Sequence, residues 1–191
     1  MTANGAKKGA LTARYAAAGT LAATTLGLLY LSSKLDNFLL HPALMAAALW
    51  LCSEALVQVK VATPAQKKGV YRTHWALQTV SFAAFLGGVY VIFTLKEEWG
   101  ESHFDTTHGQ AGLAFIVLTE IQWVLGLSYL CMPRFIATYA IKLHRFVGVL
   151  ALTSIYASFL TGVYDHMDNV PLQIVLSVLG SAAYLGLVVP L

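Results

Sequence analysis

Six long apolar stretches, separated by short polar segments, dominate the pattern of hydrophobic positions along the chain. They lie at about residues 15–31, 37–59, 73–95, 107–130, 138–164 and 170–191. A helix that crosses a bilayer needs roughly 17–25 apolar residues, and more when it is tilted. The pattern therefore predicts an all-α membrane protein with six transmembrane helices, in a single domain that covers residues 1–191.

The first apolar stretch follows a basic N-terminal segment, as the core of a secretory signal peptide would. Its apolar run continues to about Leu31, which is too long for the hydrophobic region of such a signal. We therefore expect a retained first spanning helix and no cleavable leader. No retrieval motif is visible, so the plasma membrane and the endomembranes (ER, vacuole or vesicle) are both compatible with the sequence.

Composition narrows the class of protein further. Of the 191 residues, 58% are hydrophobic and 11% are charged, whereas about a quarter of the residues of a soluble domain are charged. The bilayer is therefore the expected environment. The net charge of +3 does not indicate nucleic-acid binding, because no basic stripe with interleaved aromatic residues occurs. Cys52 and Cys131 form neither CxxC nor CxxCH, so we expect no zinc site and no covalently attached haem.

The basic residues of the polar segments predict the orientation in the membrane. With six spans, one side carries Lys7, Lys8, Arg14, Lys60, Lys67, Lys68, Arg72, Arg134, Lys142 and Arg145. The other side carries Lys34 and Lys96, together with Asp36, Glu97, Glu98, Glu101, Asp105, Asp165 and Asp168. Cytoplasmic loops are enriched in Lys and Arg. We therefore expect both termini in the cytosol and an acidic face on the opposite side.

Four of the six histidines lie near the starts of consecutive apolar stretches: His41, His74, His108 and His144. Consecutive spanning helices run antiparallel, so these histidines alternate between the two sides of the membrane. His41 and His108 then share the non-cytosolic side, and His74 and His144 share the cytosolic side. Two histidines on different helices at one level are what a six-coordinate haem requires, so the pattern favours two haems.

Other interpretations of the four histidines exist. A zinc ion would need three or four ligands in one place. A proton relay would string ionisable groups across the membrane instead of pairing them at two levels. Single histidines also anchor helix ends at the interface. A haem-free transporter or scaffold that uses these histidines as a proton relay is therefore the alternative hypothesis.

Glu54 and Glu120 are acidic residues within spanning stretches, where such groups are costly and usually functional. They follow His41 and His108 at an interval of roughly 18–20 Å along a helix. We expect them near the cytosolic level, as acceptors for the ligand imidazoles or as partners of Arg72 or Arg145, and their role stays open. Five glycines in the spanning stretches have no side chain, so either a porphyrin or another helix could pack closely against the backbone there. They are Gly87, Gly88, Gly109, Gly112 and Gly148.

Four motifs give the chain a resemblance to a known family. They are HPALM at 41–45, THWALQ at 73–78, HFDTTHGQAGL at 103–113 and HRFVG at 144–148. In this order and spacing they resemble the eukaryotic cytochrome b561 family, particularly its short stand-alone members with six helices. The sequence HGQAG at 108–112, where many members have HSWLG, fits this short branch.

The resemblance implies a four-helix core, formed by helices 2–5 over about residues 37–164, that holds two haems b. The implied axial ligand pairs are His41 with His108 and His74 with His144, which agrees with the pairing by level. The resemblance also implies transmembrane electron transfer from cytosolic ascorbate. The acceptor on the other side would be monodehydroascorbate radical or a ferric chelate, and a homodimer is conceivable.

Charged residues near the histidines are candidates for substrate binding. Ascorbate is a monoanion at neutral pH, and basic residues beside the cytosolic pair would attract it. The candidates are Lys67, Lys68, Arg72 and Arg145, whose alternative role is only to fix the topology. On the other side, His103 would bind substrate or carry a proton, or would be a solvated loop residue. His166, between Asp165 and Asp168, would help to attract ferric iron.

Overall fold

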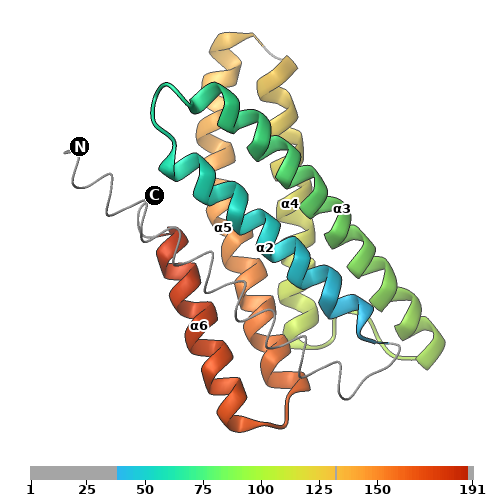
Figure 1. Ribbon diagram of the computed structural model, residues 1–191. Helices are drawn as coiled ribbons and strands as arrows, with labels where there is room; N and C mark the ends of the chain where they lie inside the picture. Colours follow the sequence, from blue (N-terminus) through green and yellow to red (C-terminus); the bar gives the residue numbers. More distant parts are fainter. Residues whose placement is uncertain (1–37, 132, 189–191) are drawn as a thin grey trace. The chain divides into compact units, whose positions relative to one another are not determined.

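A computed structural model describes residues 38–131 and 133–188 (Figure 1). Within these residues it contains five α-helices and no strand. The helices are α2 (Leu40–Val61), α3 (Lys67–Trp99), α4 (Thr107–Cys131), α5 (Arg134–His166) and α6 (Val170–Val188). The stretch at 15–31, expected as a first spanning helix, lies outside the described residues. The fold is therefore all-helical over the part described.

All five described helices are long and apolar enough to cross a membrane. Each overlaps one of the apolar stretches at 37–59, 73–95, 107–130, 138–164 and 170–191, with ends displaced by a few residues. Large apolar side chains are exposed on every one of them, including Trp50, Tyr90, Val124, Phe146 and Val178. Such surfaces are stable in contact with lipid, so these helices are those of a multi-pass membrane protein.

Two of the helices are longer than the apolar stretches indicated. Helices α3 and α5 have 33 residues each, or about 50 Å, against a hydrocarbon core of about 30 Å. The sequence pattern placed Lys67, Lys68 and Arg72 in a short loop, but all three lie on α3. That placement was wrong because polar residues continue a helix once it has left the apolar core.

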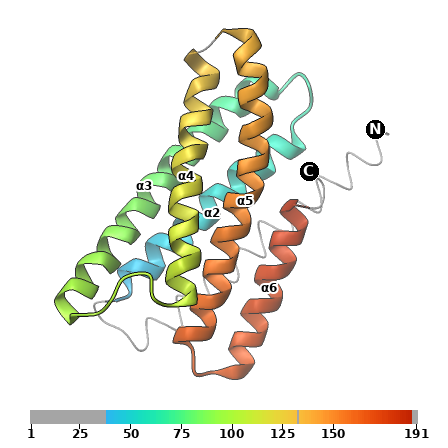
Figure 2. The ribbon, with the colours of Figure 1, turned by 180° about the vertical axis from the view of Figure 1, so that it is seen from behind.

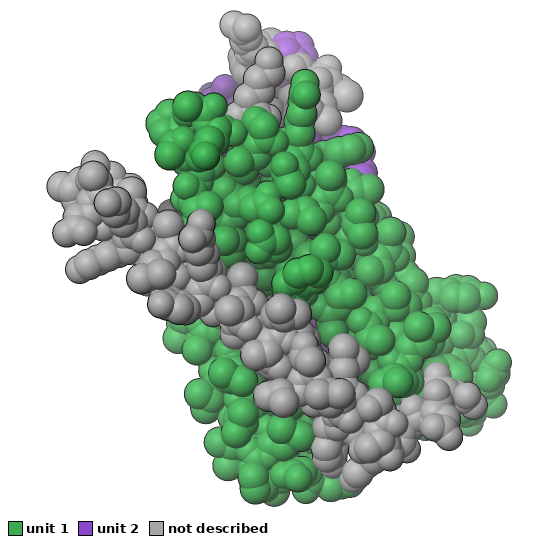
Figure 3. All heavy atoms as spheres, in the orientation of Figure 1, with its two compact units in different colours: residues 1–103, 167–191 green, residues 104–166 purple. Residues whose placement is uncertain are grey.

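The described helices divide between two compact units, coloured separately in Figure 3. Helices α2, α3 and α6 belong to the first unit, and α4 and α5 belong to the second. In each unit two consecutive helices form an antiparallel hairpin, α2 with α3 and α4 with α5 (Figures 1 and 2). Each hairpin contains two of the four histidines.

The α2–α3 hairpin is held by contacts between its two helices. Ser81 Oγ in α3 donates a 2.7 Å hydrogen bond to the carbonyl oxygen of Ala48 in α2. Close approach of the helices near the start of α2 depends on Gly88. A Cβ atom at Gly88 would lie 3.0 Å from the Met45 side chain and 3.3 Å from Leu44 Cβ. This glycine therefore allows the backbone of α3 to approach α2 closely.

Polar contacts fix the ends of the helices in place. Thr106 Oγ1 caps α4 by accepting a 3.0 Å hydrogen bond from Gly109 N–H, which satisfies an N–H that has no partner within the helix. Asn169 caps α6 similarly, through a 3.1 Å bond from Leu172 N–H. Gly100 ends α3 in the left-handed conformation, with φ of 68°, which glycine adopts without strain. The helix starts that carry His108 and Val170 are thus well defined.

Candidate functional site

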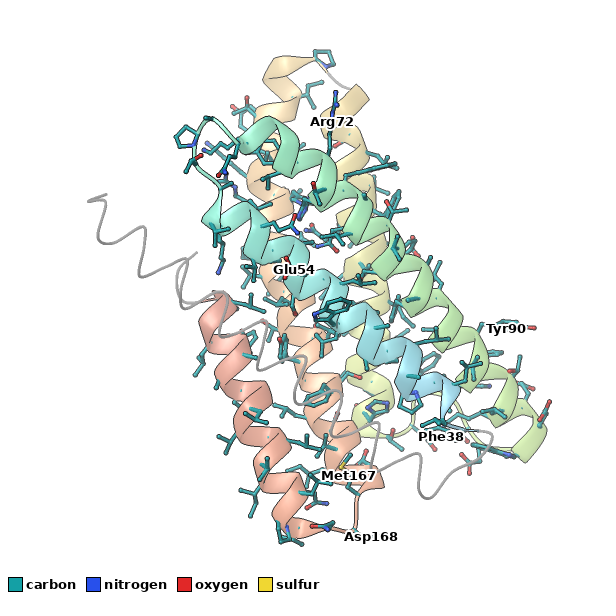
Figure 4. All side chains as sticks on the ribbon, in the orientation of Figure 1. Phe38, Glu54, Arg72, Tyr90, Met167 and Asp168 are labelled. Carbon is teal, nitrogen blue, oxygen red and sulfur yellow. The ribbon has the colours of Figure 1, made fainter. Side chains whose placement is uncertain are left out.

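His41 lies in the first turn of α2 and is buried. Its Nδ1–H donates a 2.8 Å hydrogen bond across the hairpin to the carbonyl oxygen of Gly88 in α3. The Phe38 ring lies 5.6 Å from the imidazole, between ring centres. Figure 4 shows Phe38 at the beginning of α2, at the opposite end of the hairpin from Arg72. His41 therefore has a fixed place at one end of the α2–α3 hairpin.

His74 lies near the other end of the same hairpin. It is two turns into α3, and its Nδ1–H donates a 3.1 Å hydrogen bond to the carbonyl oxygen of Ala55 in α2. The two histidines of this hairpin thus use the same device: each imidazole reaches across to a backbone carbonyl of the neighbouring helix. A backbone acceptor needs no particular side chain, so it cannot be recognised in the sequence.

His108 repeats this arrangement in the α4–α5 hairpin. Its Nδ1–H donates a 2.8 Å hydrogen bond to the carbonyl oxygen of Ser158 in α5. Its ring lies directly against Gly162, where a Cβ atom would be 2.9 Å from Nδ1 and 3.0 Å from Cε1. The first of these distances is too short for a real Cβ atom. Glycine at 162 is therefore required by the position of the His108 ring.

These three hydrogen bonds determine which imidazole nitrogen is available to a metal. A neutral imidazole carries its proton on one nitrogen and a lone pair on the other. Because Nδ1 donates to a carbonyl oxygen in His41, His74 and His108, the lone pair lies on Nε2. Metal-binding histidines commonly have this arrangement, since the second hydrogen bond orients the ring and increases its basicity. The donor chemistry therefore fits axial ligands of haem iron.

His144 in α5 has a different kind of partner. Its Nε2 lies 3.4 Å from the side-chain Nε2 of Gln122 in α4. The ring packs beside Gly126, where a Cβ atom would lie 3.7 Å from Cε1. His144 thus contacts a side-chain amide where the other three histidines donate to backbone carbonyls.

The four contacts show that the two hairpins are built on one common interval along the chain. This interval is the sequence separation between a histidine and the residue on the same helix that contacts the other histidine of the hairpin. The separation is the same from His74, the second histidine of its hairpin, to Gly88 as it is from His144 to Ser158. The partners of those second histidines, Ala55 and Gln122, follow His41 and His108 at this interval too. The common interval corresponds to about four helical turns, or roughly 21 Å. Each hairpin therefore holds its histidines at two levels with the same separation.

His103 lies in the segment that follows α3, where it interacts with that helix. Its Nε2 lies 2.7 Å from a carboxylate oxygen of Glu97, and its ring stacks on Phe93 at 4.0 Å between centres, with planes 9° apart. The sequence suggested either a substrate-binding histidine or a solvated loop residue. The contacts show a partly exposed histidine that is held in place between an aromatic ring and a carboxylate.

The basic candidates occupy the end of α3 that is near His74. Lys67 and Arg72 lie two turns and half a turn before His74, and both side chains are exposed. The side chain of Lys68 lies outside the described residues. In the other hairpin, Arg145 follows His144 directly and is exposed. In each hairpin, exposed basic side chains therefore lie close in sequence to one histidine, His74 or His144.

The opposite end of α3 is acidic, with Glu97 and Glu98 in its last turn. In the other hairpin, Asp165 is exposed near the end of α5. The side chain of His166, expected to help attract ferric iron, lies outside the described residues. Attraction of iron by these groups stays a prediction.

Two acidic residues lie in spanning helices, with roles that the sequence left open. Glu54 accepts a 3.0 Å hydrogen bond from Gln58 Nε2, one turn later in α2, and His74 donates to the carbonyl oxygen of the next residue, Ala55. The Glu120 side chain is exposed. A role for either carboxylate beside the ligand imidazoles stays a prediction.

The glycines of the candidate porphyrin surfaces pack within their own hairpins. Gly88 approaches Met45, Gly109 approaches the backbone of Phe104, and Gly148 approaches Gln122. Gly112 makes an ordinary contact with Ser158 Oγ, at 3.6 Å from a Cβ position. Of the two roles that the sequence left open, helix packing is the one that these contacts support.

Sequence reasoning missed several residues that orient the histidines: Gly88, Ala55, Gln122, Ser158 and Gly162. The common interval would have revealed the first four once the helices were paired as hairpins. Gly162 carries no signal of this kind. It is a single glycine in an apolar helix, and its role depends on the ring that faces it.

Comparison with known proteins gives related results. A family model described as eukaryotic cytochrome b561 matches residues 40–168. Transmembrane reductase CYB561D2 of Homo sapiens is 30% identical over 158 residues, which are 78% of this chain and 68% of that protein. Its counterpart in Mus musculus is 29% identical over 159 residues, which are 79% and 69% of the two chains.

A plant protein is also similar. The probable ascorbate-specific transmembrane electron transporter 1 of Oryza sativa subsp. japonica is 28% identical over 131 residues, which are 64% of this chain and 56% of that protein. No solved structure matches the chain. The family match begins directly before His41 and includes both hairpins.

Proposed function

Because the chain belongs to the eukaryotic cytochrome b561 family, we propose that it is a transmembrane oxidoreductase that transfers electrons from cytosolic ascorbate to an acceptor across the membrane. One observation carries the proposal. In both hairpins, histidines occupy two levels separated by the common interval, and three of them donate Nδ1–H to a backbone carbonyl. That arrangement leaves Nε2 for a metal at each of these histidines.

The proposed cofactors are two haems b, with axial ligand pairs His41 with His108 and His74 with His144. The pairing follows from the level of each histidine and from the family resemblance. When bound, the haems would supply one-electron redox chemistry, and these imidazoles would hold the iron. The ligand-bearing region is the proposed haem-binding core, at about residues 37–164 of a single domain with a sixth spanning helix. Both termini are proposed to be cytosolic, and a homodimer is part of the proposal by resemblance only.

On the cytosolic side, exposed basic groups would bind the donor. Lys67 and Arg72 display their charges on rigid helix close to His74, and Arg145 does so next to His144. Lys68 shares this segment of α3. Positive charge raises the local concentration of an anion such as ascorbate and stabilises its bound form. The name of the rice relative, an ascorbate-specific electron transporter, supports this choice of donor.

On the opposite side, His103 would serve the acceptor. Reduction of monodehydroascorbate radical to ascorbate takes up one electron and one proton, and a histidine held by a carboxylate is suited to deliver that proton. Glu97 and Phe93 keep the His103 ring in place for this role. Reduction of a ferric chelate takes up the electron alone, and the acidic end of α3, with His166 and Asp165 in another segment, would attract the iron.

The first test is spectroscopic and functional. Purified protein reduced with dithionite should show a b-type α-band and contain two haems per chain. In vesicles that hold ascorbate on the cytosolic side, an external ferric chelate or monodehydroascorbate should be reduced as ascorbate is oxidised inside. A folded but colourless preparation would contradict the proposal and favour the haem-free transporter or scaffold.

Substitutions on the two sides of the membrane should distinguish the donor site from the acceptor site. We expect Lys67→Gln with Arg72→Gln to raise the half-saturating ascorbate concentration roughly tenfold, because attraction of the anion is lost, with the spectrum unchanged. Lys96→Gln, which removes a basic residue at the other end of α3, is the matched control. His103→Gln should leave the ascorbate dependence intact and slow the reduction of monodehydroascorbate. An unchanged ascorbate dependence in the double variant would assign Lys67 and Arg72 to topology alone.

A further inference from the structure

Gln122 contacts His144 through its side chain, whereas the contacts described above for His41, His74 and His108 are with backbone carbonyls. It follows His108 at the common interval, so it corresponds to Ala55 in the other hairpin. Ala55 has no polar side-chain atom and contacts His74 through its carbonyl oxygen. Gln122 instead places its side-chain amide 3.4 Å from His144 Nε2. The amide is therefore an additional polar group at this level of its hairpin.

The neighbouring helix makes room for this amide. A Cβ atom at Gly148, one turn after His144, would lie 2.8 Å from Gln122 Nε2. In the α2–α3 hairpin the corresponding position, one turn after His74, is Gln78. Each hairpin therefore has a glutamine near its second histidine, on the first helix in one hairpin and on the second helix in the other. Gln78 Nε2 contacts the Cys52 sulfur at 3.7 Å, whereas Gln122 contacts a histidine.

The oxygen atom of the Gln122 side-chain amide also bears on the role of this residue. Its Oε1 atom is buried and has no hydrogen-bond partner among the residues that the structure describes. Leaving a buried acceptor unsatisfied is unfavourable, so a partner is expected for it. Turning the amide about its last bond exchanges its oxygen and nitrogen in nearly the same place. Gln122 Oε1 can thus take the place of Gln122 Nε2 and accept from His144 Nε2–H, which leaves His144 Nδ1 as the nitrogen that would bind a metal.

We propose that Gln122 is the positioning residue of His144 and adjusts the electron donation of this ligand through the imidazole N–H. This proposal rests on the proposed function, in which His144 is an axial ligand. An acceptor on the N–H of a ligating imidazole increases its basicity and stabilises the ferric state, which lowers the reduction potential. At His41, His74 and His108 the acceptor is a backbone carbonyl, which substitutions cannot remove.

Two substitutions of Gln122 give opposite expected results. Gln122→Met keeps the length of the side chain but removes the acceptor, so the midpoint potential of one haem should rise. Gln122→Glu strengthens the acceptor, so the same potential should fall. The second haem should keep its potential in both variants. The matched control is Gln78→Met, the same change near the second histidine of the other hairpin, which should leave both potentials unchanged.

Spectroelectrochemical titration of the purified holoprotein measures both potentials, and haem content and the low-spin EPR signals report on ligation. Two haems with unshifted potentials in both Gln122 variants, or a shift in the same direction in both, would overturn the proposal and leave Gln122 as a filler of the space beside Gly148. Absence of haem from the wild-type protein would instead refute the proposed function. If Gln122→Glu fails to fold, Gln122→Met alone decides, because an unshifted potential there also overturns the proposal.

Discussion

If the chain holds the two proposed haems, replacing His144 by alanine should remove one of them, leave the other in place and abolish the proposed transfer from ascorbate. An iron that loses one of its two imidazoles is held by a single ligand, and the cavity left by the side chain admits water to the site. The haem content should therefore fall by about half. His74→Ala should have the same effect, because these two histidines are the proposed ligands of a single iron.

The double variant tests the pairing directly. If His74 and His144 hold the same haem, His74→Ala with His144→Ala should lose no more haem than either single change, since contributions within one site are not additive. Combining His144→Ala with His108→Ala should remove both haems. Haem content is measured by pyridine haemochrome and by the reduced spectrum. Loss of both haems from the His74/His144 double variant would show that the pairs are assigned wrongly. His103→Ala is the control and should keep both haems.

Gly162→Ala should displace the His108 ring and lower occupancy of the haem that His108 is proposed to bind. The added methyl group would lie 2.9 Å from Nδ1, the atom that donates to the Ser158 carbonyl. The ring must move, and the hydrogen bond that orients it is lost. Overpacking of this kind costs about 1–3 kcal/mol. The change should appear as a loss of one haem during purification and as altered EPR signals of the remainder.

Gly112→Ala is the matched control for this substitution. It makes the same change in the same hairpin, one turn after His108, but its Cβ atom would make an ordinary contact of 3.6 Å with Ser158 Oγ. Alanine is favoured over glycine in a helix by up to about 1 kcal/mol. Gly112→Ala should therefore keep both haems and be at least as stable as the wild type. If Gly162→Ala also keeps both haems with unchanged spectra, the close packing at His108 has no part in ligation.

The sequence predicted the described helices well, and it placed His41 and His74 at opposite ends of their hairpin, because both predictions depend on simple periodic properties. Apolar stretches long enough to span a bilayer locate the five described helices to within a few residues at most ends. The alternation of antiparallel helices places His41 and His74 at opposite ends of their hairpin, as their contacts with Gly88 and Ala55 confirm. The resemblance to the family is confirmed by the match at residues 40–168.

The sequence predicted the surroundings of the histidines poorly. Nothing in the sequence marks the partner of His74, because His74 donates to a backbone carbonyl, a group that every residue possesses. Similarly, the basic residues around Arg72 were placed in a loop, because hydropathy marks where the apolar core ends and not where the helix ends. Contacts between two helices depend on how each helix is rotated about its own axis, and a single sequence does not specify this rotation.

The common interval in the two hairpins limits how the chain can change in length during evolution. The connections between Val61 and Lys67 and between Cys131 and Arg134 differ in size without altering the distance between levels. Insertions in these connections leave the distance between the two histidine levels unchanged. A single residue inserted between His41 and Ala55 would rotate everything after it by about 100° and advance it by about 1.5 Å. Insertions and deletions in homologous chains should therefore be confined to the ends of the hairpins.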